Sequence, residues 1–329
     1  MTIDPLSWLD ERAAARVAAG LRRELRPRAA QTPSIDLASN DYLGLVRHPE
    51  VIEGAIDAVR RWGAGATGSR LVTGTTAAHA ELEADLAEFV GAEAGLVFAS
   101  GYAANLGVVT ALAGRGALVV SDAGSHASLV DACRLSRARV AVAAHRDVDA
   151  VDRLLAERSE ERALVLTDSV FSADGDLAPL VELHRVTRAR GAVLVVDEAH
   201  GLGVRGAGGR GLVHELGLAG QPDLVITATL SKALAAQGGV VLAAERVRAH
   251  LVDAARTFIF DTGLAPAAVG AAPAALPGLR RAPDQAARGR ARRARTAAPG
   301  GVRGDPERSR PSRLSGGRRD RPAAHAALS

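Results

Sequence analysis

The chain has 329 residues, of which 47% are hydrophobic and 24% are charged, and its formal net charge at pH 7 is +4. This composition is typical of a globular enzyme, and no apolar run approaches the roughly 18 residues that cross a bilayer, so no membrane partner is expected. A single cysteine, Cys133, excludes an intrachain disulfide, and the N-terminus has acids but no apolar signal region, so we expect a cytoplasmic protein.

The first 275 residues are predicted to form two structural regions. Residues 1–45 are expected to form an amphipathic helix and an arm, and residues 46–275 alternate short β-branched runs with helical patterns. Helices are expected at 51–62, 77–90, 126–138 and 179–190, and strands at 95–100, 117–122, 139–145, 163–169, 192–200, 224–230 and 238–243. The strands are almost entirely apolar, which predicts a mostly parallel sheet with helices on both faces, a three-layer α/β/α domain.

Residues 276–329 break this pattern and form the third predicted region. The segment holds 14 Arg and four acids, a charge of +10, so the formal total of +4 leaves −6 for the rest of the chain. It has no strand pattern and few large apolar residues, so we expect it to be disordered. It also has no Phe, Tyr or Trp on which bases could stack, and a basic tail on an acidic body does not indicate a nucleic-acid partner.

The sequence does not support several common kinds of ligand-binding or catalytic site. Two glycine runs, at 63–68 and 201–206, match the dinucleotide pattern, but neither stands directly between a strand and a helix. The only lysine lacks the preceding glycines of a P-loop, and no histidine or cysteine spacing suits a metal. No nucleophile elbow surrounds Ser172. These absences argue against nicotinamide, nucleotide, metal and hydrolase sites.

Lys232 is the one lysine among 41 basic residues. Drift toward Arg codons accounts for the arginines, but it does not explain why this position is lysine. Arginine can neither form a Schiff base nor lose its proton near neutrality, whereas lysine does both. The sequence therefore predicts a chemical task for Lys232.

Polar residues near the predicted strand ends suit pyridoxal phosphate, which needs a lysine, an acid at its ring nitrogen, a partner for the ring face and donors for its phosphate. Asp197 ends an apolar strand and suits the ring nitrogen, although a helix cap is an alternative task for it. His200 suits the phenolic oxygen, and His126 could stack on the ring or be structural. The helix that opens at 100–107 offers backbone N–H groups, and Thr229 offers a hydroxyl.

Eight motifs in consistent order resemble the α-oxoamine synthases, fold-type-I pyridoxal-phosphate enzymes. They are SNDYLGL (39–45), GATGSRLVTG (65–74), SGYAANLG (100–107), SDAGSHASLVDACRLS (121–136), TDSVFSADGD (167–176), VVDEAHGLGV (195–204), TLSKALAAQGG (229–239) and FDTGLAPA (260–267). The resemblance covers about residues 6–275.

The resemblance implies a role for each matching residue. Lys232 would carry pyridoxal 5'-phosphate, Asp197 would pair with its ring nitrogen, and His200 would contact its phenolic oxygen. His126 would stack on the ring, and both His126 and Arg22 would contact substrate. The remaining implied cofactor contacts are Gly101, Tyr102, Ser172, Thr229 and, across a homodimer, Thr262.

The implied reaction is the decarboxylative condensation of L-alanine with a pimeloyl thioester. Another member of the group, joining glycine to acetyl-CoA, is an alternative, and so is an inactive remnant that only binds the cofactor. The family continues with a compact C-terminal domain that nothing after Leu276 resembles. We therefore expect this domain to be missing or scrambled by a lost reading frame, with low turnover as the result.

Overall fold

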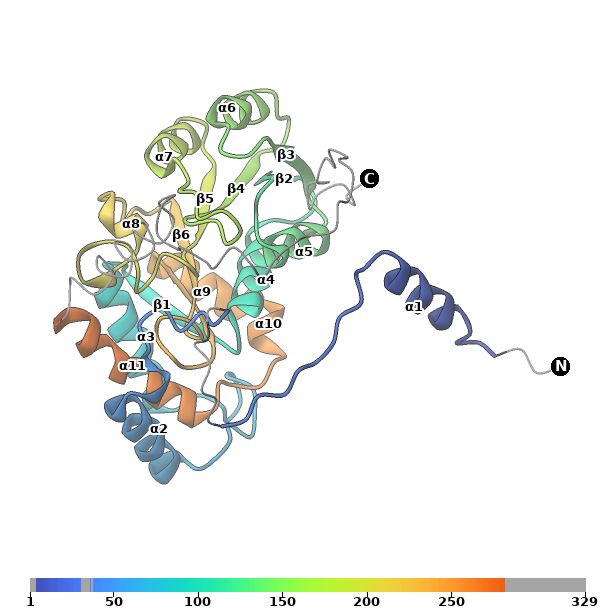
Figure 1. The fold of residues 1–329 in the computed structure, drawn as a ribbon. Coiled ribbons are helices and arrows are strands. Elements are labelled where there is room, and N and C mark those ends of the chain that lie inside the picture. Colours follow the sequence, from blue (N-terminus) through green and yellow to red (C-terminus); the bar gives the residue numbers. More distant parts are fainter. Residues whose placement is uncertain (1–3, 31–35, 37, 282–329) are drawn as a thin grey trace, which may run out of the picture. The chain divides into compact units, whose positions relative to one another are not determined.

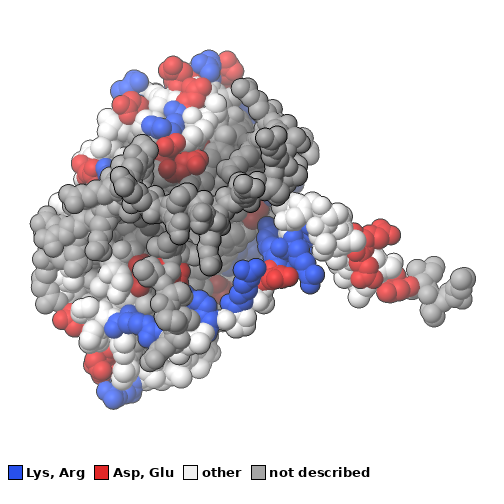
Figure 2. Space-filling model, in the orientation of Figure 1, with Lys and Arg blue, Asp and Glu red and all other residues white. Residues whose placement is uncertain are grey.

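The computed structural model describes residues 4–30, 36 and 38–281 and divides the chain into two compact units, Met1–Ser39 and Asn40–Ser329 (Figure 1). In the first unit, α1 (Trp8–Ala18) confirms the predicted helix. Asp10 in its first turn and Arg16 in its last turn complement the helix dipole, and none of its side chains is buried. Exposed arginines follow the helix, where Figure 2 shows blue side chains gathered: Arg22, Arg23, Arg26 and Arg28.

The second unit is built on a seven-stranded sheet with the order β1-β7-β6-β5-β4-β2-β3. The strands are β1 (Ala94–Phe98), β2 (Ala117–Asp122), β3 (Arg139–Ala143), β4 (Arg162–Asp168), β5 (Val193–Asp197), β6 (Leu224–Thr229) and β7 (Gly239–Ala243). The five from β3 to β6 in this order are parallel, and β7 pairs antiparallel with both β6 and β1. The predicted strands and the mostly parallel sheet are confirmed.

Helices cover both faces of this sheet and make three layers (Figure 1). Side chains alternate along the strands, so Leu118 and Val120 of β2 join one core cluster while Val119 joins the other. One face is covered by α2 (Pro49–Trp62), α3 (Ala77–Val90), α6 (Val148–Ala156), α7 (Leu180–Ala189), α8 (Leu212–Glu215) and α11 (Pro266–Arg281). The other is covered by α4 (Gly101–Leu112), α5 (Ala127–Ser136), α9 (Glu245–Ala254) and α10 (Arg256–Ile259). Two short 3₁₀ turns, η1 (Leu45–Arg47) and η2 (Ala207–Gly209), complete the unit.

Helix α11 corrects one predicted boundary. The helix continues through Arg281, past Leu276, where the tail was expected to begin. Leu276 and Leu279 are 3% and 6% exposed and belong to the same core cluster as Val269, so the apolar stripe of the helix extends into the predicted tail. Residues 282–329, the rest of that tail, lie outside the described residues.

Glycines allow α11 to approach α2 closely. A Cβ added at Gly270 would lie 2.3 Å from the Gly54 carbonyl oxygen, and one at Gly54 would lie 2.6 Å from the Gly270 oxygen. Backbone atoms on both sides leave no room for a side chain. Across residues 4–30, 36 and 38–281, no helix has both the length and the apolar character that a membrane span requires.

Candidate active site

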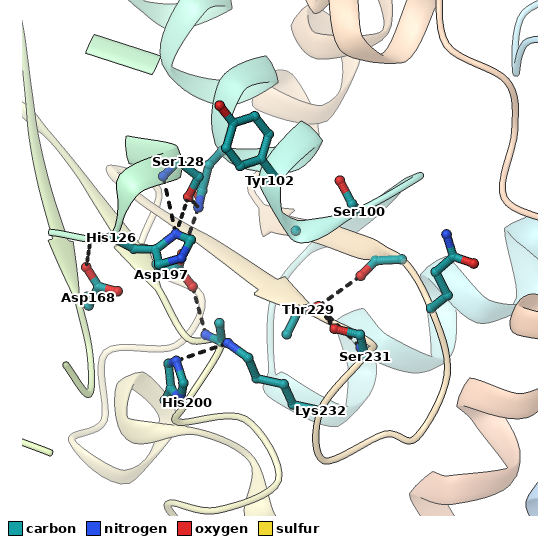
Figure 3. A pocket seen from close by; sticks show the side chains of 15 residues that line it. Ser100, Tyr102, His126, Ser128, Asp168, Asp197, His200, Thr229, Ser231 and Lys232 are labelled. Carbon is teal, nitrogen blue, oxygen red and sulfur yellow. Dashed lines mark hydrogen bonds between the residues drawn. The ribbon is translucent and has the colours of Figure 1, made fainter. Parts of the chain in front are cut away.

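A cavity of about 380 Å³ lies where strands β4, β5 and β6 end and helices α4 and α5 begin (Figure 3). The last residues of these three strands, Asp168, Asp197 and Thr229, all line it. This is the edge at which a mostly parallel sheet is expected to bind its ligand. The cavity is lined by Ser100, Gly101, Tyr102, Asn105, His126, Ser128, Asp168, Asp197, Ala199, His200, Thr229, Ser231, Lys232, Gln237 and Gly238.

Most of the residues predicted for the site meet in this cavity. They are Gly101, Tyr102, His126, Asp197, His200, Thr229 and Lys232. Ser172 does not line it, because the turn after β4 leaves the strand end and carries Ser172 to the exposed surface. Thr262 is also exposed, in a bridge with Ser69, and its expected contact lies in a partner subunit. Arg22 belongs to the first unit, so its substrate contact stays a prediction.

Lys232 lies in a short loop between the antiparallel strands β6 and β7. The loop is closed by backbone hydrogen bonds from Leu230 N to Gly238 O at 3.0 Å and from Ala236 N to Leu230 O at 2.9 Å. Ala235, within the loop, has a φ of 51°, which a non-glycine residue seldom adopts. The loop therefore holds the lysine backbone in one defined turn at the cavity wall.

The Lys232 amine is the first member of a hydrogen-bonded chain. Its Nζ lies 3.0 Å from His200 Nε2, and His200 Nδ1 lies 2.6 Å from the Tyr42 hydroxyl (Figure 3 shows the first of these contacts). Tyr42 also donates to Asn40 Oδ1 at 3.0 Å. The SNDYLGL segment thus reaches a site formed by β5 and β6, a contact that the sequence did not reveal.

Burial shifts the proton affinities of this pair toward the neutral forms. Desolvation lowers the pKa of Lys232 below its ordinary value, although the charges of Asp197 and Asp168 oppose that shift. Burial, followed by the neighbouring Lys232 and His126, lowers the pKa of His200 to about 4. His200 is therefore neutral at physiological pH, and Lys232 releases its proton more readily than a solvent-exposed lysine.

Two carboxyl groups lie side by side opposite the amine. Asp168 and Asp197 are register partners at the ends of β4 and β5, and both are at most 5% exposed. Asp197 accepts hydrogen bonds from Ala199 N at 2.8 Å and Asn105 Nδ2 at 2.7 Å. Burial, and then the charge of Asp197, raises the pKa of Asp168 well above its ordinary value. One carboxylate of the pair thus retains its charge at the least cost when its neighbour is protonated.

The beginning of α4 supplies an anion site on another wall. Ser100 caps the helix by accepting from Ala103 N at 3.0 Å, and the N–H groups of Gly101 and Tyr102 precede the first intrahelical bonds. A Cβ added at Gly101 would lie 3.1 Å from Thr229 Cβ, so glycine permits the helix to approach β6. The Thr229 hydroxyl lies 2.7 Å from that of Ser231.

His126 precedes α5 and is held by its backbone and its ring. Its N–H donates to Asp168 Oδ2 at 3.0 Å, and its Nδ1 lies 2.8 Å from Ser128 Oγ. His126 is therefore anchored at the carboxyl edge of the sheet and exposes part of its ring to the cavity.

These groups fit pyridoxal phosphate. The cavity offers one amine with a lowered pKa, a buried carboxylate, an imidazole on its wall and a helix N-terminus with flanking hydroxyls. Those are the four kinds of partner that the cofactor requires. Among the described residues, no group of three or more His, Cys, Asp or Glu side chains could hold a metal ion. The fold and the site define the class of fold-type-I pyridoxal-phosphate enzymes.

Comparisons with known proteins narrow this class. Residues 32–296 match the family model "aminotransferase class I and II", so the chain belongs to that family. Within it the chain is an α-oxoamine synthase: it is 69% identical over 281 residues to 8-amino-7-oxononanoate synthase of Mycobacterium avium, covering 85% of this chain and 74% of the relative. It is 71% identical over 272 residues to 8-amino-7-oxononanoate synthase 1 of Mycobacterium tuberculosis, covering 83% and 70%.

Solved structures agree with this placement. The serine palmitoyltransferase of Sphingomonas wittichii has a TM-score of 0.79 at 34% identity, covering 87% of this chain and 75% of that one. A serine palmitoyltransferase variant from S. paucimobilis, with a bound adduct of pyridoxal phosphate and myriocin, has a TM-score of 0.77 at 32% identity, covering 85% and 74%. The 8-amino-7-oxononanoate synthase of Francisella tularensis has a TM-score of 0.68 at 28% identity, covering 78% and 72%. The resemblance drawn from the sequence motifs is confirmed.

Proposed function

We propose that the chain catalyses the decarboxylative condensation of L-alanine with a pimeloyl thioester, giving 8-amino-7-oxononanoate, CO₂ and a free thiol. The observation that carries the proposal is the meeting of Lys232, Asp197 and the N-terminus of α4 in one cavity, in a chain about 70% identical to synthases of that name. The substrates are small molecules, and the cofactor is pyridoxal 5'-phosphate.

Lys232 has two tasks in this proposal. When bound, pyridoxal phosphate supplies an electron-accepting ring that stabilises negative charge on the α carbon of the amino acid. Lys232 Nζ would hold the cofactor through its aldehyde, and the freed amine would take the proton from the α carbon of L-alanine. The lowered pKa of Lys232 favours the neutral amine that both tasks need.

The other cavity residues would hold and orient the cofactor and the substrate. Asp197 would keep a proton on the ring nitrogen, which maintains the electron demand of the ring, and His200 would contact the phenolic oxygen. His126 would stack on the ring and contact the substrate. Gly101 and Tyr102, at the helix N-terminus, and Thr229 would hold the phosphate. Arg22 would contact the acyl substrate.

We further propose a homodimer in which Thr262 completes the partner's phosphate site. Three apolar side chains near the bridge between Ser69 and Thr262 support this arrangement: Leu71, Val72 and Phe260 are 52%, 78% and 69% exposed. A second copy would cover this apolar surface. We place the protein in the cytoplasm, where a reducing environment suits its single buried thiol, Cys133.

The test begins with the absorbance spectrum of the purified full chain with pyridoxal phosphate. We expect a cofactor band near the visible–ultraviolet border, and borohydride should then fix the label on the peptide that contains Lys232. Thiol release is measured next with pimeloyl-CoA and either L-alanine or glycine. Release with alanine supports the proposal. The same assay is repeated with glycine and acetyl-CoA. A chain that stays colourless and unlabelled, or that releases thiol only with glycine and acetyl-CoA, contradicts the proposal.

A further inference from the structure

A buried network of side chains connects Asp197 with His126, the residues proposed to pair with the ring nitrogen and to stack on the ring. Its centre is Asn105 of α4, which is 2% exposed. Asn105 Nδ2 donates to Asp197 Oδ2 at 2.7 Å and to Ser128 Oγ at 2.8 Å, and its Oδ1 accepts from Thr227 Oγ1 at 2.6 Å. Both amide hydrogens and the amide oxygen are thus engaged.

The partners of Asn105 determine which way its amide faces. In the reversed orientation Oδ1 would face the carboxylate of Asp197, and two acceptors would meet inside the protein without a hydrogen between them. The hydroxyl of Thr227 donates to the amide oxygen on the opposite side and stabilises the observed orientation. Because Ala199 N donates to the other oxygen of Asp197, the plane of this carboxylate is fixed at both ends.

The same amide sets the tautomer of His126. Ser128 Oγ accepts a hydrogen from Asn105, so its own hydrogen is directed to His126 Nδ1 at 2.8 Å. The backbone N–H of Ser128 also donates to His126 Nδ1, at 3.3 Å. With two donors directed at Nδ1, the neutral imidazole carries its hydrogen on Nε2. His126 is therefore a hydrogen-bond donor through Nε2 and can bind an anionic group.

We propose that Asn105 is a positioning residue that fixes the carboxylate of Asp197 and, through Ser128, the tautomer of His126. The proposal rests on the proposed function, which gives those two residues their tasks. It adds that one amide holds both the carboxylate of Asp197 and, through Ser128, the ring of His126. Asn105 itself acts through Asp197 and His126.

The central test removes the network's outer donor without changing the shape of the core. Thr227→Val abolishes the hydrogen bond to Asn105 Oδ1, whereas Thr227→Ser keeps the hydroxyl and should rescue it. The control is Thr187→Val in α7, which also loses a fully buried threonine hydroxyl, bonded to His184 O at 3.0 Å, away from the cavity. Asn105→Ala is the direct variant.

Three quantities are measured on the full chain: the Kd for pyridoxal phosphate, the pH at which the bound cofactor band changes, and the concentration dependence on L-alanine. We expect the cofactor Kd to rise on the order of tenfold in Asn105→Ala and by roughly three- to tenfold in Thr227→Val. The pH of the band change should move in both variants. Thr227→Ser and Thr187→Val should match the unmodified chain in all three measurements. Ser128→Ala should weaken the apparent affinity for L-alanine with a smaller effect on the cofactor Kd.

The outcomes separate this inference from the proposed function. If the unmodified chain forms no cofactor band, the proposed function fails and this inference fails with it. If the unmodified chain forms the band but Thr227→Val behaves as Thr187→Val does, in both Kd and the pH of the band change, only the inference is overturned. Should Asn105→Ala not fold, the three threonine variants decide the question.

Discussion

Two groups of buried and partly buried ionisable side chains in the second unit have different surroundings. In one, Arg70 and Glu83 are 8% and 6% exposed and paired at 2.9 Å. Arg70 also donates to Thr75 Oγ1 and Val97 O, while Glu83 accepts from Val97 N at 2.8 Å. Each charge there has a protein partner, which is the usual condition for burying ions.

The other group faces the cavity, and its charges are held by hydrogen bonds with neutral groups and not by an ion pair. The amine of Lys232 has His200 as its hydrogen-bond partner, and two carboxyl groups, Asp168 and Asp197, lie together at the strand ends. Lys232, His200 and Asp168 have pKa values displaced from their ordinary range. Buried charges that are paired with each other stabilise the fold, whereas charges that border a cavity are available for chemistry.

The largest effect expected from this comparison is the loss of turnover in Lys232→Ala. We expect turnover to fall at least about a thousandfold, because both the cofactor attachment and the base at the α carbon disappear. The melting temperature of the full chain should stay the same or rise, since burial of this amine is unfavourable. Lys232→Arg keeps a cation and should be equally inactive. A Lys232→Arg chain with substantial turnover would contradict the assignment.

The opposite result is expected for the paired group. Arg70→Met leaves Glu83 buried without its partner and should lower the free energy of unfolding by about 3–5 kcal/mol. Chemical denaturation measures this change, and the cofactor Kd of the folded variant should be unaltered. Arg60→Met is the matched control. Its exposed pair with Asp57, at 3.3 Å, should contribute less than about 1 kcal/mol. Equal losses in the two variants would show that burial of the first pair has no consequence.

A third prediction concerns the pH dependence of stability. His200 takes up a proton near pH 6.5 in the unfolded chain but only near pH 4 in the folded one, so stability falls as the pH decreases through this window and levels off below it. His200→Gln should reduce that fall when the unfolding of the full chain without cofactor is followed at several pH values. His48→Gln, which removes an exposed histidine, is the control. An unchanged pH profile in His200→Gln would argue against a buried neutral imidazole.

Some residues of the site could be predicted because the sequence around them has a clear pattern or an unusual composition. Asp197 ends an apolar strand, and Lys232 is the only lysine, so pattern and composition were enough to single them out. The role of Asn105 was not predicted, because Asn105 lies in a mostly apolar helix and its partners Thr227 and Ser128 are distant in sequence. Long-range pairing of this kind leaves no periodic trace along the chain.

The fold shows the same division. The strands were predicted correctly because both faces of the sheet are buried, which makes their apolar runs continuous. The predicted start of the tail at residue 276 was wrong because the segment after residue 275 has few large apolar residues and no strand pattern. In the structure α11 packs against α2, and Leu276 and Leu279 are buried in the core. Ser172 was expected in the pocket because the resemblance implied a cofactor contact, but the turn after β4 carries it to the exposed surface.

The closed loop that carries Lys232 has a consequence for how substrate exchanges. Backbone bonds at both ends of the 230–238 turn, which joins two strands of the same sheet, prevent it from swinging as a hinge. The Lys232 amine has to leave the cofactor and then approach a substrate carbon. This movement must come from rotation about the four bonds of the lysine side chain. The backbone of Lys232 is fixed and its side chain is flexible, so the length of that side chain limits the volume in which the chemistry can occur.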